Sequence, residues 1–265
     1  MSTPIKVIIV GALGKMGRET VKALENRLDM AIAGLVDVMH PGVSFAELTG
    51  IDCGLDLEND LEGLIAKVKP DVMIDFTNPQ AVFNNTRRAL ACGVNCVVGT
   101  TGLNEAELSQ LEQLAQANGT GVAVIPNFAI GAVLMMKFAQ EAARYLPDVE
   151  IIETHHDQKM DAPSGTALKT AEMINANRGI QPPRNSREFE KIPGSRGGKA
   201  GDIRIHSVRL PGFVAHQEVI FGGPGQSLTI RHDSYDRVGF MPGVVMAVQK
   251  IVGIKGLVYG MDALM

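Results

Sequence analysis

Short apolar runs alternate with segments of helical periodicity over about the first 125 residues of the chain. The run at 6–10 is rich in β-branched residues and ends at Gly11, as expected of a parallel strand that is buried on both faces. This alternation predicts a doubly wound parallel sheet, whose strands all end at one edge. The expected strands lie at 6–10, 30–36, 72–74, 94–98 and 122–125, and the expected helices at 16–28, 61–68, 79–92 and 104–117.

The pattern changes after residue 128. Helices are expected at 130–145 and 164–178, a strand at 149–155, and a long loop over the Pro/Gly/Arg-rich stretch 180–201. Three strand-like segments follow at 202–210, 213–221 and 226–233, separated by Pro/Gly turn signals. The fold class is therefore α/β: a Rossmann-like doubly wound sheet plus a second α+β domain with a mixed, largely antiparallel sheet. We expect a dinucleotide-binding domain over 1–128, completed by 240–265 with a helix at 244–252, and a substrate-binding domain over 129–239.

Composition excludes several classes of protein. The chain is 45% hydrophobic and 20% charged, so it can build a core. Its net charge of −4 disfavours a protein that binds nucleic acid by bulk electrostatics. The 3 cysteines are scattered, which argues against a disulfide framework or a zinc site. No apolar run approaches membrane-spanning length, and the first one stops at Gly11, so we expect a cytoplasmic protein.

Gly11, Gly14 and Gly17 are spaced GxxGxxG between the first strand and the first helix. Glycines at these places permit a tight turn, let a pyrophosphate approach the helix N-terminus, and allow close packing of helix on strand. Asp37 lies 20 residues beyond Gly17, where it can accept the ribose hydroxyls of adenosine. A plain strand-to-helix turn is the alternative, but this context favours dinucleotide binding.

Asp37 also bears on the choice of cofactor. A carboxylate there repels the 2′-phosphate of NADP, and Val38 follows where an arginine could bind that phosphate. Lys15 could supply a compensating charge, although a solvated lysine is the simpler interpretation. The sequence thus favours NADH and leaves NADPH open.

Three further segments end expected strands: Phe76-Thr77, residues 99–101 and residues 126–128. In a doubly wound sheet they converge beside the nicotinamide half of the cofactor. Thr77 and Thr101 could instead be helix N-caps.

The densest chemical cluster lies at 153–166. Ser164 can cap the helix that follows, and the N–H groups near Gly165 and Thr166 then form an anion site. Lys159 adds positive charge, and the histidines can transfer protons near neutral pH. Two alternatives are a solvated His-His pair and a metal site completed by Asp157.

In these motifs the chain resembles the dihydrodipicolinate reductase family. The resemblance rests on GxxGxMG at 11–17, Asp-Phe-Thr at 75–77, Gly-Thr-Thr-Gly at 99–102, Asn127-Phe128, and Glu-x-His-His-x-x-Lys-x-Asp-Ala-Pro-Ser-Gly-Thr at 153–166, in family order. It implies reduction of a cyclic imine dicarboxylate by NADH or NADPH in diaminopimelate and lysine synthesis. It also implies a homotetramer formed through the second domain.

The resemblance assigns roles residue by residue. His155 matches the catalytic histidine of proton transfer, and Lys159 matches the general acid that protonates the ring nitrogen. His156, Gly165 and Thr166 match the binders of the substrate carboxylate, and no metal is implied. The matched cofactor contacts are Gly11, Ala12, Leu13, Gly14, Lys15, Met16, Asp37, Gly99, Thr100, Thr101, Ile125, Pro126, Asn127 and Phe128.

Some positions depart from the family pattern. Val38 and Asn78 stand where members that favour NADPH often carry arginine, and 208–219 is a variant of a glycine-rich strand turn. The basic stretch 184–204 is either a solvated loop or, by resemblance, a segment that folds over the substrate.

Other functions are weighed against the reductase. One is another Rossmann oxidoreductase acting on an imine or amino acid, such as an aspartate dehydrogenase; another is an NADH-sensing regulator that touches nucleic acid. A desulfurase-like relative is a further alternative, and the presence of Lys159 favours the reductase over it.

Overall fold

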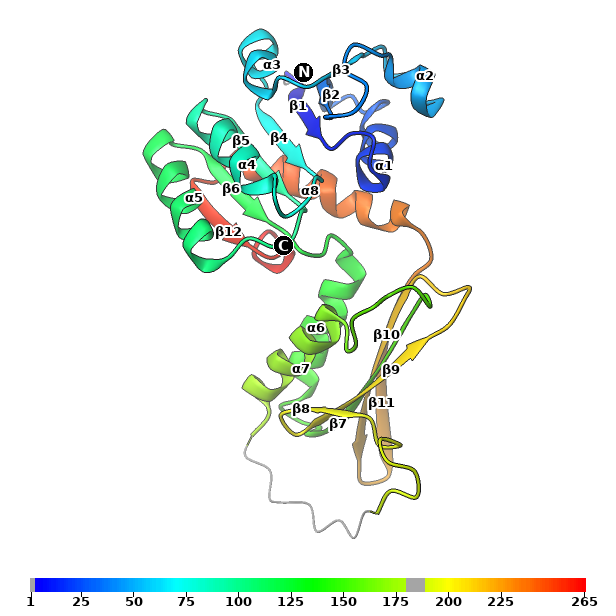
Figure 1. The fold of residues 1–265 in the computed structure, drawn as a ribbon. Helices are drawn as coiled ribbons and strands as arrows, with labels where there is room; N and C mark the ends of the chain where they lie inside the picture. The colour runs from blue at the N-terminus through cyan, green and yellow to red at the C-terminus, as the bar shows by residue number, and fades with distance from the viewer. Residues whose placement is uncertain (1–2, 180–188) are drawn as a thin grey trace. The chain divides into compact units, whose positions relative to one another are not determined.

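The computed structural model describes residues 3–179 and 189–265. The chain forms two compact units (Figure 1). The first comprises Met1–Phe128 and Phe240–Met265, and the second comprises Ala129–Gly239. Each unit has its own sheet, helices and core.

The first unit is built on a parallel sheet of seven strands, which confirms the predicted doubly wound class. Its order is β12-β6-β5-β4-β1-β2-β3, so the direction of winding reverses between β1 and β4. The two edge strands, β3 and β12, are short and were not predicted. The strands are β1 (Ile5–Val10), β2 (Met30–Val36), β3 (Leu57–Glu58), β4 (Val72–Asp75), β5 (Asn95–Val98), β6 (Gly121–Val124) and β12 (Gly256–Tyr259).

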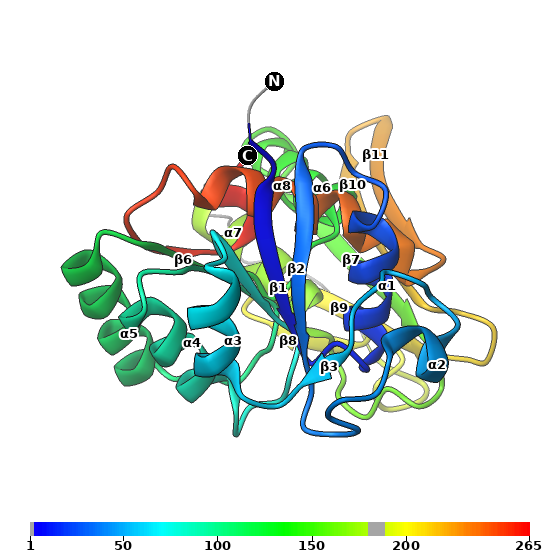
Figure 2. The same ribbon diagram turned by 90° about the horizontal axis from the view of Figure 1, so that it is seen from above.

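Helices cover both faces of this sheet. Helices α1 (Lys15–Leu24) and α8 (Met241–Ile251) pack together on one face (Figure 2). The other face carries α3 (Leu61–Val68), α4 (Val82–Ala91) and α5 (Glu105–Asn118), and a short α2 (Phe45–Thr49) precedes β3. The predicted extension of the first helix to Leu28 is wrong: α1 ends at Leu24, the chain turns toward β2, and Leu28 is 94% exposed.

The second unit has a mixed sheet of five strands in the order β11-β10-β7-β9-β8. Only the pair β7–β9 is parallel. Strands β9 and β10 are consecutive in the chain, yet β7 lies between them. The elements are α6 (Ile130–Ala142), β7 (Asp148–His155), α7 (Gly165–Asn177), β8 (Gly198–Ala200), β9 (Ile203–Arg209), β10 (Ala215–Gly223) and β11 (Gln226–Ser234).

The loop expected over 180–201 needs correction at its end, because β8 lies within it and pairs with β9. Arg184 and Arg187 of the basic stretch fall outside the described residues. Beyond them, Arg196 forms an ion pair with Glu150 of β7 and Arg204 one with Glu190. These parts of the stretch are therefore tied to the second unit.

The face of the second sheet that meets α6 and α7 changes from apolar to polar along the strands. One row across it joins Ile205, Ile151, Val219 and Ile230, and all but Ile230 belong to the buried core. The next row on this face, two residues along each strand, holds Ser207, Glu153, Gln217 and His232. A run of polar side chains under two helices is costly unless each is hydrogen-bonded, so this end of the sheet marks a candidate site.

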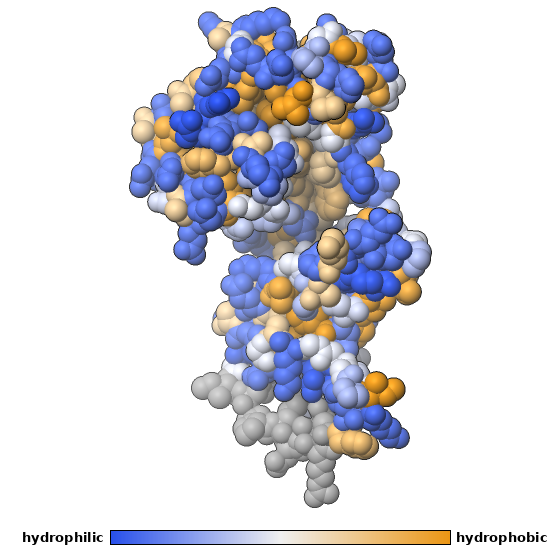
Figure 3. Space-filling view, in the orientation of Figure 1, coloured by the Kyte–Doolittle hydropathy of each residue, from blue (hydrophilic) through white to orange (hydrophobic). Residues whose placement is uncertain are grey.

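Hydrophilic residues cover most of each unit on the face shown in Figure 3, with hydrophobic residues in patches between them. Within the described residues, none of the helices has the length and apolar character needed to cross a membrane.

Candidate active site

The first unit gathers the predicted cofactor residues at one edge of its sheet. Five neighbouring strands, in the order β6, β5, β4, β1 and β2, end there. The residues that follow them are 125–128, 99–101, Phe76-Thr77, the glycine loop and Asp37. The winding reverses within this group, between β1 and β4, which is where open α/β sheets bind ligands.

The glycine loop is shaped by close backbone contacts. Gly11 has φ +79°, and a Cβ atom there would lie 2.5 Å from the carbonyl oxygen of Phe76. A Cβ on Gly17 would lie 2.3 Å from the carbonyl oxygen of Gly11, so α1 packs directly on the turn. Both positions therefore require glycine.

This loop fits a dinucleotide. Gly14 is the N-cap of α1, and in the described part of the chain no side chain caps that helix end and its first turn holds no acidic residue. Such an end attracts a phosphate. Asp37 lies beside it and accepts hydrogen bonds from the N–H of Leu13 (3.0 Å) and the N–H of Met39 (3.1 Å). The carboxylate thus links the glycine loop to the end of β2.

Asp75 organises the neighbouring strand ends and was missed as a functional residue by the sequence reasoning. It is fully buried at the end of β4. Its carboxylate accepts hydrogen bonds from the Thr77 hydroxyl (2.7 Å), the Thr100 hydroxyl (2.8 Å) and the Asn85 amide (2.9 Å). Thr77 is thus a partner of Asp75, and the N-caps of α4 and α5 are Ala81 and Asn104 rather than Thr77 and Thr101.

Two aromatic rings pack at the ends of β4 and β6. Phe76 and Phe128 meet edge to face, with ring centroids 5.6 Å apart. A Cβ on Gly99 would lie 2.2 Å from the Phe76 ring and 2.9 Å from the Phe128 ring. Gly99 is therefore needed for the rings to close over the end of β5.

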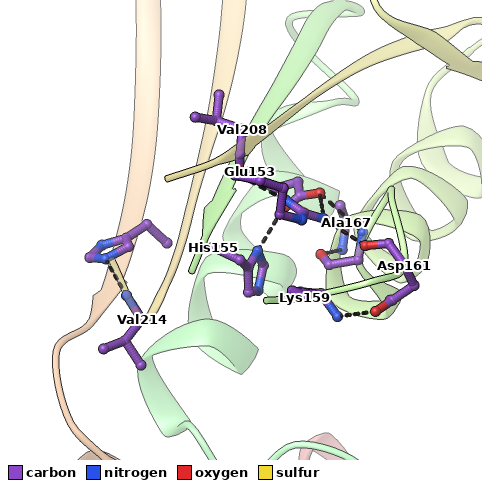
Figure 4. A network of polar contacts seen from close by, with 10 residues as sticks. Glu153, His155, Lys159, Asp161, Ala167, Val208 and Val214 are labelled. Carbon is purple, nitrogen blue, oxygen red and sulfur yellow. Dashed lines mark hydrogen bonds and ion pairs between the residues drawn. The ribbon is translucent and has the colours of Figure 1, made fainter. Parts of the chain in front are cut away.

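In the second unit, the carboxyl end of β7 carries a buried ionic network (Figure 4). Glu153 is fully buried, and its carboxylate contacts Nδ1 of His155 at 2.5 Å. Arg209 of β9 donates two hydrogen bonds to the same carboxylate, of 2.8 and 2.9 Å. Burial raises the pKa of Glu153, but hydrogen bonds from Arg209, Ser207 and His155 outweigh it and leave the pKa below its usual value.

The loop after β7 brings Lys159 to the same place. Its ammonium group forms an ion pair of 2.6 Å with the exposed carboxylate of Asp161, and this contact lowers the pKa of Asp161. The carbonyl oxygen of Asp161 accepts a hydrogen bond of 2.7 Å from Arg209, which ties the loop to the buried network. His156 is exposed on the turn that leads to Lys159.

Helix α7 begins next to this loop. Ser164 is its N-cap, as expected, and its hydroxyl accepts the Ala167 N–H at 3.2 Å. Its own N–H donates to Glu153 at 3.2 Å. Gly165 and Thr166 form the first turn, so the second unit places them beside the loop of Lys159 and the network of His155.

Glu153 and Arg209 were missed as site residues by the sequence reasoning. Glu153 was visible two residues beyond Ile151 and four beyond Val149, positions that share one face of the predicted strand, so a charge there signals a buried polar role. Arg209 lies 56 positions away in sequence, and only the parallel pairing of β7 with β9 brings it opposite His155. Among the residues placed by the structure, no group of three or more His, Cys, Asp or Glu side chains is arranged to hold a metal ion.

Comparison with known proteins matches both units. Residues 5–128 match the family model "Dihydrodipicolinate reductase, N-terminus", and residues 131–265 match "Dihydrodipicolinate reductase, C-terminus". The chain is 65% identical over 267 residues to the 4-hydroxy-tetrahydrodipicolinate reductase of Syntrophomonas wolfei, and the match covers 100% of both chains. It is 50% identical over 268 residues to the enzyme of the same name from Moorella thermoacetica, and that match covers 100% of this chain and 99% of the relative. A solved structure, the dipicolinate-bound dihydrodipicolinate reductase from Paenisporosarcina sp. TG-14, superposes with a TM-score of 0.89 at 46% identity, covering 99% of this chain and 100% of that one.

Proposed function

Because the chain belongs to the dihydrodipicolinate reductase family and is an NAD(P)H-dependent 4-hydroxy-tetrahydrodipicolinate reductase of diaminopimelate and lysine biosynthesis, we propose that His155 and Lys159 transfer the proton of that reaction. The observation that carries the assignment is the placement of an oriented histidine, a lysine and a helix N-terminus around one point of the second unit. Reduction of a cyclic imine needs one hydride and one proton.

The nucleotide-binding role falls to the first unit. The N-terminus of α1 and the loop Gly11–Met16 would hold the pyrophosphate, and Asp37 would accept the ribose hydroxyls. A bound NADH or NADPH supplies the hydride. Residues 99–101 and 125–128 would line the nicotinamide side, positioned through Asp75 and the Phe76–Phe128 pair.

The dicarboxylate substrate would bind at the start of α7. The reductase from Paenisporosarcina sp. TG-14 binds dipicolinate, a dicarboxylate. In this chain a carboxylate would find the first-turn N–H groups of Gly165 and Thr166, together with His156 on the adjoining loop.

Lys159 would donate the proton to the ring nitrogen. In the structure its ammonium group is paired with Asp161, which is exposed, so a bound anion can replace that partner at little cost. His155 is held by Glu153 and completes the set of groups that exchange protons.

The negative charge of Asp37 favours NADH over NADPH, because it repels the 2′-phosphate of NADPH. The exposed residue that follows, Val38, offers that phosphate no positive charge. We also propose that the enzyme works in the cytoplasm as a homotetramer, assembled through the sheet of the second unit.

A coupled assay tests the proposed function. The substrate is generated in place from pyruvate and aspartate semialdehyde by the preceding synthase, and consumption of NADH or NADPH is followed by absorbance. We expect rapid oxidation that depends on the synthase and is faster with NADH. Protein that binds NADH but oxidises neither cofactor would contradict it, and a panel of imines and amino acids, aspartate included, would then follow.

A further inference from the structure

Glu153 has more partners than a structural ion pair needs. One oxygen contacts Nδ1 of His155 (2.5 Å) and Nη1 of Arg209 (2.9 Å). The other accepts from Nη2 of Arg209 (2.8 Å) and from the N–H of Ser164 (3.2 Å). Figure 4 shows Glu153 and His155 side by side on the same strand, with Lys159 and Asp161 nearby.

The state of Glu153 fixes the state of the histidine nitrogen that faces it. An ionised carboxylate can only accept hydrogen bonds, and the lowered pKa of Glu153 means that it is ionised at neutral pH. Nδ1 of His155 must therefore carry the hydrogen of their shared bond. The other ring nitrogen, Nε2, is left for the chemistry of the site.

The charges around His155 keep its ring neutral. Burial lowers its pKa, the Glu153 carboxylate raises it, and the positive charges of Lys159 and Arg209 lower it again, with a net shift below the usual value. Across β10 the facing residue is Ala215, which brings no charge. Without Arg209, one of the two positive neighbours that lower the pKa of His155 would be lost, and that pKa would rise.

We propose that Glu153 and Arg209 are a positioning pair that holds His155 as the Nδ1–H tautomer, so that the bare Nε2 can take up a proton from solvent and pass it on in the reduction. The pair also anchors the loop of Lys159, because Arg209 donates to the carbonyl oxygen of Asp161. One buried carboxylate thus orients both groups assigned to proton transfer. The proposal rests on the role proposed for His155.

The same strand offers a matched control. Glu150 lies on the opposite face of β7 and also joins an arginine and a histidine, Arg196 and His206. The contact of its carboxylate with Nε2 of His206 is 2.8 Å. Glu150→Gln therefore removes a similar network outside the site.

The experiment is a pH titration of ¹⁵N-histidine-labelled protein by NMR, with His155 assigned through His155→Gln. We expect wild-type His155 at pH about 7.5 to carry its hydrogen on Nδ1 with a bare Nε2, and to titrate below pH about 6.5. Glu153→Gln should lower the pKa of His155 further, because only positive neighbours remain. Arg209→Gln should raise it, and Glu150→Gln should leave it unchanged.

Kinetics supply a second readout. We expect Glu153→Gln to reduce kcat by about 10–100-fold, as loss of an orienting partner does at metal-bound histidines. The acidic limb of kcat/KM should move down in pH with this variant and up with Arg209→Gln. A structural role alone would lower the amount of folded enzyme without moving the limb.

Three results would overturn the proposal: wild-type His155 with its hydrogen on Nε2, an imidazolium at pH about 7.5, or variant titrations that match Glu150→Gln. If Glu153→Gln fails to fold, the tautomer of wild-type His155 and the titration of Arg209→Gln still test the proposal. The NMR result does not depend on turnover, so a neutral Nδ1–H His155 in a protein without reductase activity would contradict the proposed function and leave the positioning pair standing.

Discussion

Lys159 is held by Asp161, two residues along the same loop, with its side chain 21% exposed. Lys159→Ala removes the proposed proton donor without touching the first unit. We expect kcat to fall by about 10²–10⁴-fold, the range for loss of a general acid, while the Kd for NADH measured by fluorescence titration stays the same.

Lys169→Ala is the matched control for that variant. Lys169 lies on α7 and pairs with Glu172 at 3.0 Å, and both side chains are exposed. It should retain wild-type turnover. Near wild-type turnover in Lys159→Ala would remove this lysine from the mechanism.

Asp37→Ala tests the cofactor assignment. Hydrogen bonds to a charged group contribute about 1.5–3 kcal/mol, so we expect the Kd for NADH to rise roughly tenfold or more. NADPH should be affected less, because its 2′-phosphate no longer meets a carboxylate. Asp52→Ala is the control, since Asp52 also accepts a backbone N–H, from Gly54. Equal losses for the two cofactors would contradict the ribose assignment.

The candidate-site residues that the sequence alone predicts are those whose motif is local. Lys159, Ser164 and Gly165 lie within one short string, and the spacing of Gly11 to Gly17 identifies its turn directly. The sequence alone does not predict Asp75 and Arg209, because their partners are brought to them by strand pairing between distant segments. A single sequence carries no record of that pairing.

At the scale of elements, variants at the N-caps of α7 and α5 can distinguish an effect on helix stability from an effect on substrate binding. Ser164 caps α7 at the proposed carboxylate site, and Asn104 caps α5 on the sheet of the other unit. Each alanine variant should cost about 1 kcal/mol of unfolding free energy, measured by denaturation. Only Ser164→Ala should also raise KM for the substrate. A similar rise in Asn104→Ala would show that the effect is general.

The elements predicted best are those in which a helical periodicity or an apolar run continues over seven or eight residues. The structure bears out the helix at 61–68 and the strand at 30–36 within their expected bounds. Strands β3 and β8 have two and three residues, too few to show a period, and they form because a neighbouring strand offers them hydrogen bonds. The helix expected to reach Leu28 shows the reverse error, a helical spacing continued by chance into a turn.

At the scale of the whole molecule, the prediction to test is the homotetramer. Ile220 of β10 lies between Val219 and Phe221, which are fully buried in the core, so its side chain points to the opposite face of the sheet. We expect light scattering to give four times the chain mass for the wild type and a smaller mass for Ile220→Glu, because an interface would have to bury the new charge. Leu28→Glu, at an exposed position in the first unit, should stay tetrameric. A wild-type monomer, or a tetramer indifferent to Ile220→Glu, would contradict this.

The first unit is made of two stretches of chain, and β12 from the second stretch pairs with β6 from the first. Synthesis on the ribosome therefore leaves the edge of β6 unpaired while the residues between β6 and β12 are still being made. The second unit is continuous, from Ala129 to Gly239, and it can pack as soon as it has emerged. The nucleotide-binding sheet, although begun first, is the last part of the molecule to be completed.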